Sequence, residues 1–152
     1  MPQGSVITDE MKRAIGVETA PACYEIEKGH IRRFAEAIGD ANPLYTNEAR
    51  ARESRYGGII APPTFVRMCA APASLLDVKA VTGMERTLDG GSDWEYFYPV
   101  RPGDVIAVTA KYTEFKERDG RMGKMLIMSV QQTYRNQLGQ VVATQTVGRI
   151  IY

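Results

Sequence analysis

The stretch FAEAIGDANPLYTNEA, residues 34–49, runs from the end of an amphipathic helix into a polar turn. The helix is expected over residues 30–38 because apolar side chains recur at i, i+3, i+4 and i+7, namely at Ile31, Phe34, Ala35 and Ile38. A glycine ends the helix, and the Asn-Pro pair just beyond Asp40 predicts an extended turn. One loop therefore carries a carboxylate, Asp40, and a phenol, Tyr45. On local chemistry alone, a plain helix end and turn is favoured.

Shorter elements are expected on both sides of this stretch. Thr8 can cap a helix that ends at Gly16, and the alternation of apolar residues with glutamates predicts a strand within residues 22–28. Thr46 can cap a small helix over residues 47–54.

A further helix is expected to begin at Pro62-Pro63 and to run through Ala71, because proline suits the first turn of a helix. Pro72 ends this helix after roughly eight to ten residues, or about 12–15 Å. A loop that contains Gly83 is expected to follow.

From Arg86 onward apolar and polar residues alternate, which is typical of strands. Strands are expected at residues 94–98, 106–112, 126–130 and 142–151, with turns at 101–104, 118–121 and 137–140. Helices followed by long antiparallel strands predict one α+β domain over residues 1–152, with a helix from the first half covering one face of the sheet.

The composition excludes several classes of protein. The 152 residues carry a formal net charge of +1, from 19 basic and 18 acidic residues, which argues against a general nucleic-acid binder. One histidine and two distant cysteines, Cys23 and Cys69, exclude a His-rich zinc site. Residues 1–5 show no secretory signal and no apolar run approaches the roughly 18 residues of a membrane span, so a cytoplasmic protein with reduced thiols is expected.

Three stretches of the sequence resemble the MaoC-like, or R-specific, enoyl-CoA hydratases. They are residues 34–49, residues 56–65 (YGGIIAPPTF) and residues 91–104 (GSDWEYFYPVRPGD), and they occur in the family's order. The resemblance implies a hot-dog fold, in which a long antiparallel sheet wraps around one central helix.

In that family an aspartate and a histidine activate the water that adds to a trans-2-enoyl thioester. Amides at the start of the central helix hold the thioester oxygen. Asp40 matches the family aspartate, but Tyr45 stands where the family has histidine, and a phenol with a reference pKa of about 10 is a poor general base near neutrality. Pro62-Pro63 stands where the family usually has His-Gly, and proline has no N–H to offer the oxygen.

Some hydratases of this family pair a catalytic subunit with one that mainly binds substrate and commonly carries Ala-Pro-Pro-Thr-Phe, as residues 61–65 do here. The resemblance therefore implies a substrate-binding subunit, in a heterodimer or heterotetramer whose other subunit supplies the Asp/His pair. The degenerate catalytic candidates are Asp40 and Tyr45. The substrate-binding candidates are Asn42, Pro43, Tyr56, Gly58, Ile60, Ala61, Pro62, Pro63, Thr64 and Trp94. No metal or redox cofactor is implied, and coenzyme A enters as part of an acyl-CoA substrate.

The basic residues Arg50, Arg52 and Arg55 have two interpretations of about equal weight. They either anchor the phosphates of coenzyme A, which suit guanidinium groups, or form a solvated helix face. His30 is expected at the surface, and Cys69 as a buried apolar side chain within the central helix.

The short central helix also implies free volume beneath the sheet. The partnered enzyme is therefore expected to accept a bulky acyl group, branched or polycyclic. Three alternatives stay open, because one fold hosts several chemistries. They are a self-sufficient homodimeric hydratase that uses Asp40 with Tyr45, a non-catalytic acyl-CoA-binding protein, and a thioesterase.

Overall fold

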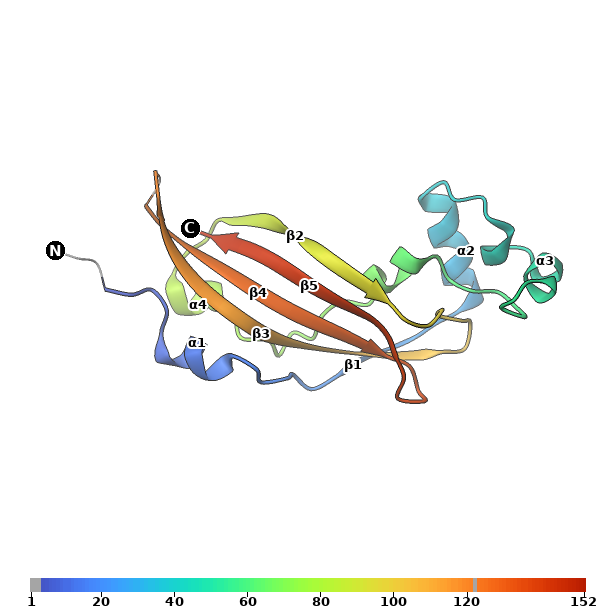
Figure 1. Cartoon of the computed structure of the whole chain (residues 1–152), viewed down its shortest axis with the longest axis horizontal. Helices are drawn as coiled ribbons and strands as arrows, with labels where there is room; N and C mark the ends of the chain where they lie inside the picture. Colours follow the sequence, from blue (N-terminus) through green and yellow to red (C-terminus); the bar gives the residue numbers. More distant parts are fainter. Residues whose placement is uncertain (1–3, 122) are drawn as a thin grey trace.

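A five-stranded antiparallel sheet forms the body of the molecule (Figure 1). The computed structural model describes residues 4–121 and 123–152. The strands follow the order β1-β3-β4-β5-β2, with bounds β1 Ala22–Glu25, β2 Thr87–Tyr96, β3 Val105–Gly120, β4 Gly123–Arg135 and β5 Val141–Ile151. The expected α+β class with long antiparallel strands in the second half is confirmed.

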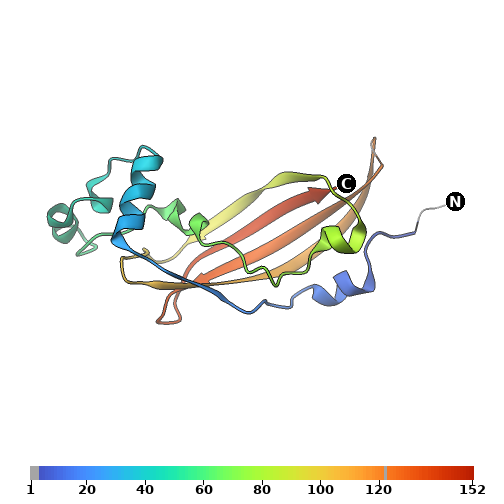
Figure 2. The same cartoon turned by 180° about the vertical axis from the view of Figure 1, so that it is seen from behind.

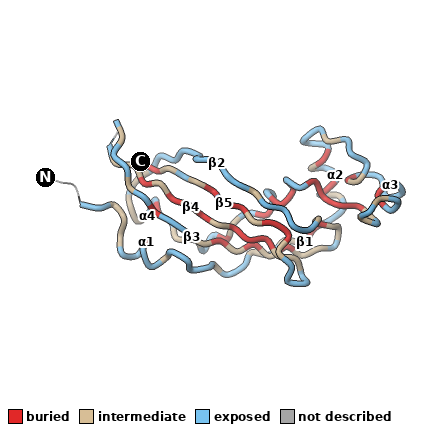
Figure 3. The backbone as a smooth tube through the Cα atoms, viewed as in Figure 1, coloured by how far each residue is buried: buried red, intermediate tan, exposed pale blue. Residues whose placement is uncertain are grey.

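One face of the sheet is buried and the other is more exposed, because apolar residues occupy every second position of the long strands. On β3 the side chains of Ile106, Val108 and Ala110 are buried, and the residues between them are less so. The edge strand β2 differs, since only Trp94 among its ten residues is partly buried (Figure 3). This edge strand also has an irregularity between Asp89 and Ser92, where a Cβ on Gly90 would lie 3.0 Å from the carbonyl oxygen of Gly148.

The helices gather at the two ends of the sheet (Figure 1). At one end lie α2 (Lys28–Ala37), the 3-10 helix η1 (Pro43–Tyr45) and α3 (Glu48–Glu53). At the other end lie α1 (Asp9–Ala14) and α4 (Val78–Thr82). Between them, the segment that follows the 3-10 helix η2 (Pro63–Met68) crosses one face of the sheet (Figure 2).

Local capping explains where the N-terminal helices begin. The Thr8 hydroxyl accepts a hydrogen bond from the Met11 amide, as expected for the cap of α1. The expected Thr46 cap of α3 is wrong, because the Asn47 side chain accepts from the Arg50 amide and α3 begins one residue later. The chain leaves β1 at Glu25 rather than continuing to residue 28, because Glu27 already occupies the N-cap position of α2.

The apolar stripe of α2 is only partly used. Ile31 and Ala35 are buried, but Ile38 is 50% exposed, so its expected place in the core is wrong. The helix ends at Ala37, and Ile38 is the C-cap residue. Phe34 of the same stripe is partly buried, and its ring meets Phe65 edge to face with centroids 5.4 Å apart.

Several boundaries in the second half also differ from expectation. The loop expected around Gly83 contains α4, which Asp77 caps with its side chain and Gly83 ends at φ 72°. The expected turn at residues 118–121 is paired strand through Gly120, because β3 and β4 keep their register as far as Gly120 opposite Gly123. The strand expected at 94–98 is β2, which starts at Thr87 and ends at Tyr96.

The central helix is the largest correction. In place of an α-helix through Ala71, the six residues of η2 form a 3-10 helix, and Cys69 is already extended. So short a helix gains little from its own hydrogen bonds. Contacts with the sheet replace them, since Cys69 is buried and the Tyr24 hydroxyl donates to the Ala70 carbonyl at 3.1 Å. Residues 69–77, named here the strap, therefore cross the sheet without a helix, with one turn in which the Leu75 amide donates to the Pro72 carbonyl.

Because the strap covers less of the sheet than a helix would, the hydrophobic core divides into two clusters. One cluster joins α2, the loop before η2 and residues such as Val108 and Tyr134 of the sheet. The other joins Met11 of α1 and Val78 of α4 to the distal halves of β3, β4 and β5. Two buried glutamines, Gln132 and Gln145, belong to neither cluster.

Replacing Ile106, which is fully buried in the first cluster, by alanine should lower the free energy of unfolding by about 2–5 kcal/mol because a cavity remains. Leu138→Ala is the control, since Leu138 lies 74% exposed in the β4–β5 turn and should cost less than about 0.5 kcal/mol. Urea unfolding followed by circular dichroism measures both. Equal losses in the two variants would contradict the placement of the core.

Candidate functional site

The N-terminal end of η2, called here its mouth, has no amide hydrogen at its first two positions, Pro62 and Pro63. Pro62 occupies the N-cap and Pro63 the first helical position, and neither has an N–H. The amide of Ala61 is already used, because it donates to the Val100 carbonyl at 2.8 Å. Thr64 is thus the first residue of this segment with an amide hydrogen that could face a ligand. An oxygen that approached this mouth would meet two pyrrolidine rings before the first available donor, the Thr64 amide.

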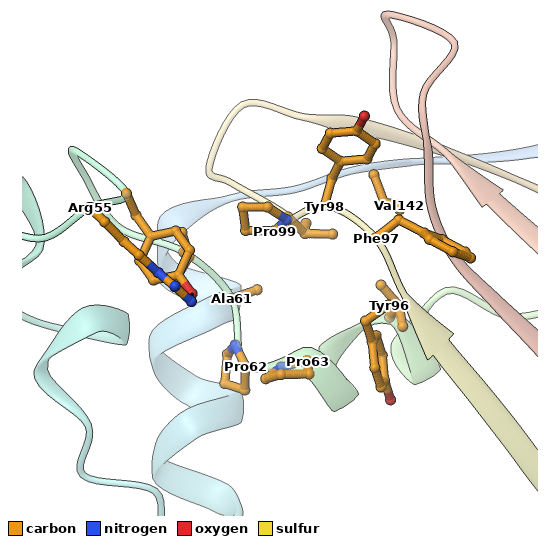
Figure 4. Close-up of a pocket in the computed structure, with 13 residues that line it drawn as sticks. Arg55, Ala61, Pro62, Pro63, Tyr96, Phe97, Tyr98, Pro99 and Val142 are labelled. Carbon is orange, nitrogen blue, oxygen red and sulfur yellow. Dashed lines mark hydrogen bonds between the residues drawn. The ribbon is translucent and has the colours of Figure 1, made fainter.

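A cleft of about 340 Å³ opens beside the two prolines. Figure 4 shows Pro62 and Pro63 between Arg55 on one side and Tyr96 on the other. The cleft is lined by Arg55, Tyr56, Ile60, Ala61, Pro62, Pro63, Val66, Tyr96, Phe97, Tyr98, Pro99, Val100 and Val142. It therefore brings together five of the expected substrate-binding residues, which are Tyr56, Ile60, Ala61, Pro62 and Pro63, with one expected phosphate-binding residue, Arg55.

Exposed aromatic rings form one wall of this mouth cleft. Tyr96, Phe97 and Tyr98 are each about half exposed, at 44%, 53% and 51%. The ring of Tyr96 stacks on Trp94 with centroids 5.8 Å apart, so the expected residue Trp94 backs the wall without lining the cleft. A row of exposed aromatic side chains is suited to covering an apolar ligand or a partner surface.

The Asp40 loop is held mainly by its own side chains. The Asp40 carboxylate accepts a hydrogen bond from the Asn42 amide at 3.0 Å, and the Asn42 side chain accepts from the Leu44 amide at 3.0 Å. Pro43 begins η1 directly after this Asn42 cap. These contacts give Asp40, Asn42 and Pro43 a role in shaping the turn, and none of the three lines the mouth cleft.

Tyr45 is buried in the core and does not line the mouth cleft. Burial raises the pKa of its phenol, and the negative charges that Asp40 and Tyr56 can carry raise it further. The phenol therefore stays protonated at neutral pH. Tyr45 borders a separate depression that is lined by Lys28, Gly29, Arg32, Thr46 and Glu48. The structure thus does not bring Asp40 and Tyr45 together with Pro62 and Pro63 in one cleft.

The three candidate arginines separate in space. Arg50 and Arg52 lie on α3 and pair with Glu53 at 3.8 Å and Glu48 at 3.7 Å. Arg52 borders another depression, together with the expected residue Gly58. Arg55 alone reaches the mouth cleft, where it donates to the Tyr56 hydroxyl at 2.6 Å and lies 4.8 Å from that ring's centroid.

A second cleft, of about 330 Å³, lies between the strap and the inner face of the sheet. Its polar lining includes Gln132 and Tyr134 on β4, Gln145 and Arg149 on β5, Arg67 on η2, and Thr87, Asp89 and Ser92 on β2. None of these residues is among the candidates that the sequence offers. The signal was present, because Gln132 and Gln145 occupy inward positions of strands whose neighbouring inward positions, Val130 and Val147, are apolar.

His30 and the possible metal ligands do not form a site in the described residues. His30 is exposed and lies 3.7 Å from Glu27, in agreement with the expected surface position. Among residues 4–121 and 123–152, no three His, Cys, Asp or Glu side chains gather as they would around a metal ion. Over the same residues, no helix combines the length and the apolar character needed to cross a membrane.

The sequence of this chain matches one protein family and several known proteins. The sequence profile described as "FAS1-like, dehydratase domain region" matches residues 13–145. A UPF0336 protein of Streptomyces coelicolor is 35% identical over 129 residues, which cover 83% of this chain and 82% of that protein. A "Probable enoyl-CoA hydratase alpha subunit" of Thermomonospora curvata is 30% identical over 131 residues, which cover 76% of this chain but 41% of the relative.

Solved structures share the fold at lower identity. The MaoC-like dehydratase of Rhodospirillum rubrum superposes with a TM-score of 0.72 at 23% identity, covering 91% of this chain and 92% of that one. The ChsH1–ChsH2 complex of Mycobacterium tuberculosis has a chain that superposes with a TM-score of 0.76 at 17% identity, covering 89% and 84%. The expected hot-dog fold is thereby confirmed, with the reduced central helix noted above.

Thiol labelling tests whether the strap stays packed beside the second cleft. Cys69 is 3% exposed and burial raises its pKa to about 11, so at pH 8 it remains a protonated, shielded thiol. Cys23 is exposed. A chromogenic disulfide reagent should therefore label one thiol in the native chain and both after unfolding, and Cys23→Ser should abolish the native signal. Fast native labelling of Cys69 would show that the strap opens.

Proposed function

This chain belongs to the FAS1-like dehydratase domain family, and on that premise we propose that it is the acyl-CoA-binding subunit of an enoyl-CoA hydratase or 3-hydroxyacyl-CoA dehydratase. In this proposal a partner hot-dog subunit supplies the Asp/His pair that activates water. This chain contributes to the acyl-binding surface and needs no metal or redox cofactor of its own.

The observation that carries the proposal is the proline-lined mouth of η2. A thioester oxygen that gains negative charge needs donors aimed at it, and such donors account for a large part of catalysis in acyl chemistry. Here Pro62 and Pro63 have no N–H, and the Ala61 amide is bonded to Val100. The water-activating half is equally poor, because Tyr45 is a buried phenol whose pKa is raised.

The free edge of the sheet supports a partner subunit. Among the described strands, β2 pairs with β5 and with no other, so its outer edge can accept another strand. The exposed aromatic residues Phe97 and Tyr98 directly follow β2. A dimer of unlike subunits would bury both features. The fold neighbours include chains from two-component assemblies, ChsH1–ChsH2 and HadBC of Mycobacterium tuberculosis.

The space beneath the sheet supports a bulky acyl group. The strap replaces most of a central helix and leaves a cleft of about 330 Å³ against β2, β4 and β5. Cavities of this size hold small ligands. The acyl group would enter at the mouth cleft, past Ile60, Ala61 and the two prolines, and extend under the sheet.

The decisive assay follows the absorbance of a trans-2-enoyl-CoA, first with the chain alone and then with a hot-dog subunit that carries the catalytic Asp/His pair. We expect turnover in the mixture only, while the isolated chain binds the thioester without hydrating it. Asp40→Asn should leave turnover by the mixture within about twofold, because Asp40 caps its own turn.

Other outcomes would favour the alternatives. Turnover by the isolated chain that Asp40→Asn abolishes would establish a self-sufficient hydratase, and release of free thiol would indicate a thioesterase. Binding without turnover, in the presence of every hot-dog partner that forms a complex with the chain, would leave a non-catalytic acyl-CoA-binding protein.

Among the described residues that line the mouth cleft, Arg55 carries the one guanidinium, and in the proposal it meets a coenzyme A phosphate. Arg55→Ala should weaken binding of an acyl-CoA about tenfold, the effect of one lost charge-assisted hydrogen bond, and should flatten the salt dependence of binding. Arg118→Ala is the matched control, because Arg118 lies exposed near the β3–β4 turn, outside the cleft. Isothermal titration calorimetry at two salt concentrations measures both, and equal affinities in the two variants would remove Arg55 from the site.

A further inference from the structure

The second cleft has a polar floor where an acyl channel would ordinarily be apolar. Gln132 of β4 and Gln145 of β5 lie directly opposite each other in the sheet, and each is only 8% exposed. The Tyr134 hydroxyl lies 3.1 Å from the side-chain oxygen of Gln132 and 3.3 Å from that of Gln145. Three polar side chains therefore meet at one point on the buried face.

This cluster has more hydrogen-bonding groups than it can satisfy internally. A phenol has one proton, so Tyr134 can donate to only one of the two carboxamide oxygens at a time. Within the described part of the chain, the amide nitrogens of Gln132 and Gln145 donate to no protein group. Every fully enclosed side-chain nitrogen or oxygen of these residues has a hydrogen-bond partner, so the two nitrogens are not fully enclosed. The spare donors therefore open onto the cleft that these glutamines line.

Positive charge borders the same cleft. Arg67 of η2 and Arg149 of β5 line it from opposite walls, and among the described residues neither has a carboxylate oxygen within 4.0 Å. Asp89 also lines the cleft, and its carboxylate accepts a hydrogen bond from the Gly91 amide at 2.8 Å. Two guanidinium groups against one carboxylate leave the lining with an excess of positive charge.

The indole ring of Trp94 lies between a residue of the mouth cleft and a residue of the second cleft. The ring of Trp94 stacks on Tyr96, which lines the mouth cleft, at 5.8 Å. The same ring stacks on Tyr134, which lines the second cleft, at 5.6 Å. A chain that enters beside the prolines and passes Trp94 would thus arrive at the glutamine pair.

We infer that this second cleft binds the distal end of the acyl group and that this end carries a carboxylate. The inference rests on the proposed acyl-CoA binding and names the substrate class that it serves. A carboxylate accepts hydrogen bonds from both carboxamides and from guanidinium groups. A hydrocarbon end would leave the buried amides unpaired, and a site built to hydrogen-bond a polar group rejects the analogue that lacks it.

The test compares acyl-CoA thioesters in matched pairs, over a series of chain lengths. In each pair the distal end is either a carboxylate or a methyl group, and calorimetry measures binding to the full chain, alone and with its catalytic partner. At the chain length that spans the two clefts, the carboxylate should bind at least about tenfold more tightly.

Two kinds of variant separate recognition from folding. Arg149→Met and Arg67→Met alter exposed side chains, so the fold should survive, and each should cut the carboxylate preference severalfold. Gln132→Leu should abolish the preference while leaving the methyl-ended thioester bound at least as tightly. Arg118→Met, which removes an exposed arginine outside the cleft, should leave the preference unchanged. Thermal melting of each variant verifies folding.

Three results would overturn the inference. If both members of every pair bind equally, the cleft does not read a carboxylate, although acyl-CoA binding stands. If a ketone-ended chain binds as tightly as the carboxylate, the recognised group is a neutral acceptor. If no thioester binds with or without the partner, the proposed function itself fails.

Discussion

Proline has no backbone N–H and fixes its own φ, and two prolines stand side by side where the chain begins to cross the sheet. From this constraint come the lack of amide hydrogens at the first two positions of the mouth and the start of a helix that lasts six residues. Because the rest of the crossing has no helix before α4, the middle of the sheet is incompletely covered. The second cleft and the division of the core into two clusters follow from that gap.

The polar residues of the Asp40 loop and those of the second cleft have different structural roles. Asp40 and Asn42 accept hydrogen bonds within the turn that leads into η1, and Tyr45 packs in the core. Gln132 and Gln145, by contrast, are buried polar side chains on a face whose neighbouring positions, Val130 and Val147, are apolar. Burying polar groups costs free energy unless they are hydrogen-bonded. That cost makes the glutamine pair, rather than the Asp40 loop, the better marker of ligand chemistry in this chain.

Periodicity predicted the strands well because alternation depends on burial of one face, which the sheet enforces along β3, β4 and β5. It failed at the crossing segment, where residues 64–71 look α-helical. The chain forms a 3-10 helix only to Met68 and is extended at Cys69, which is buried next to the Tyr24–Ala70 hydrogen bond. The resemblance to a family motif marked Tyr56, Ile60 and the prolines, and these residues line one cleft because they are consecutive or nearly so. No such motif marks the second cleft, because it combines residues of β4, β5 and η2 that are far apart in the sequence.

The outer edge of β2 has one further consequence. An unpaired strand edge invites any extended chain, yet the irregularity at Asp89–Ser92 and the close approach of Gly90 to Gly148 break the regular spacing of its backbone groups. Only a strand shaped to that interruption can pair along the whole edge. Copies of this chain would therefore resist stacking edge to edge into open-ended fibres.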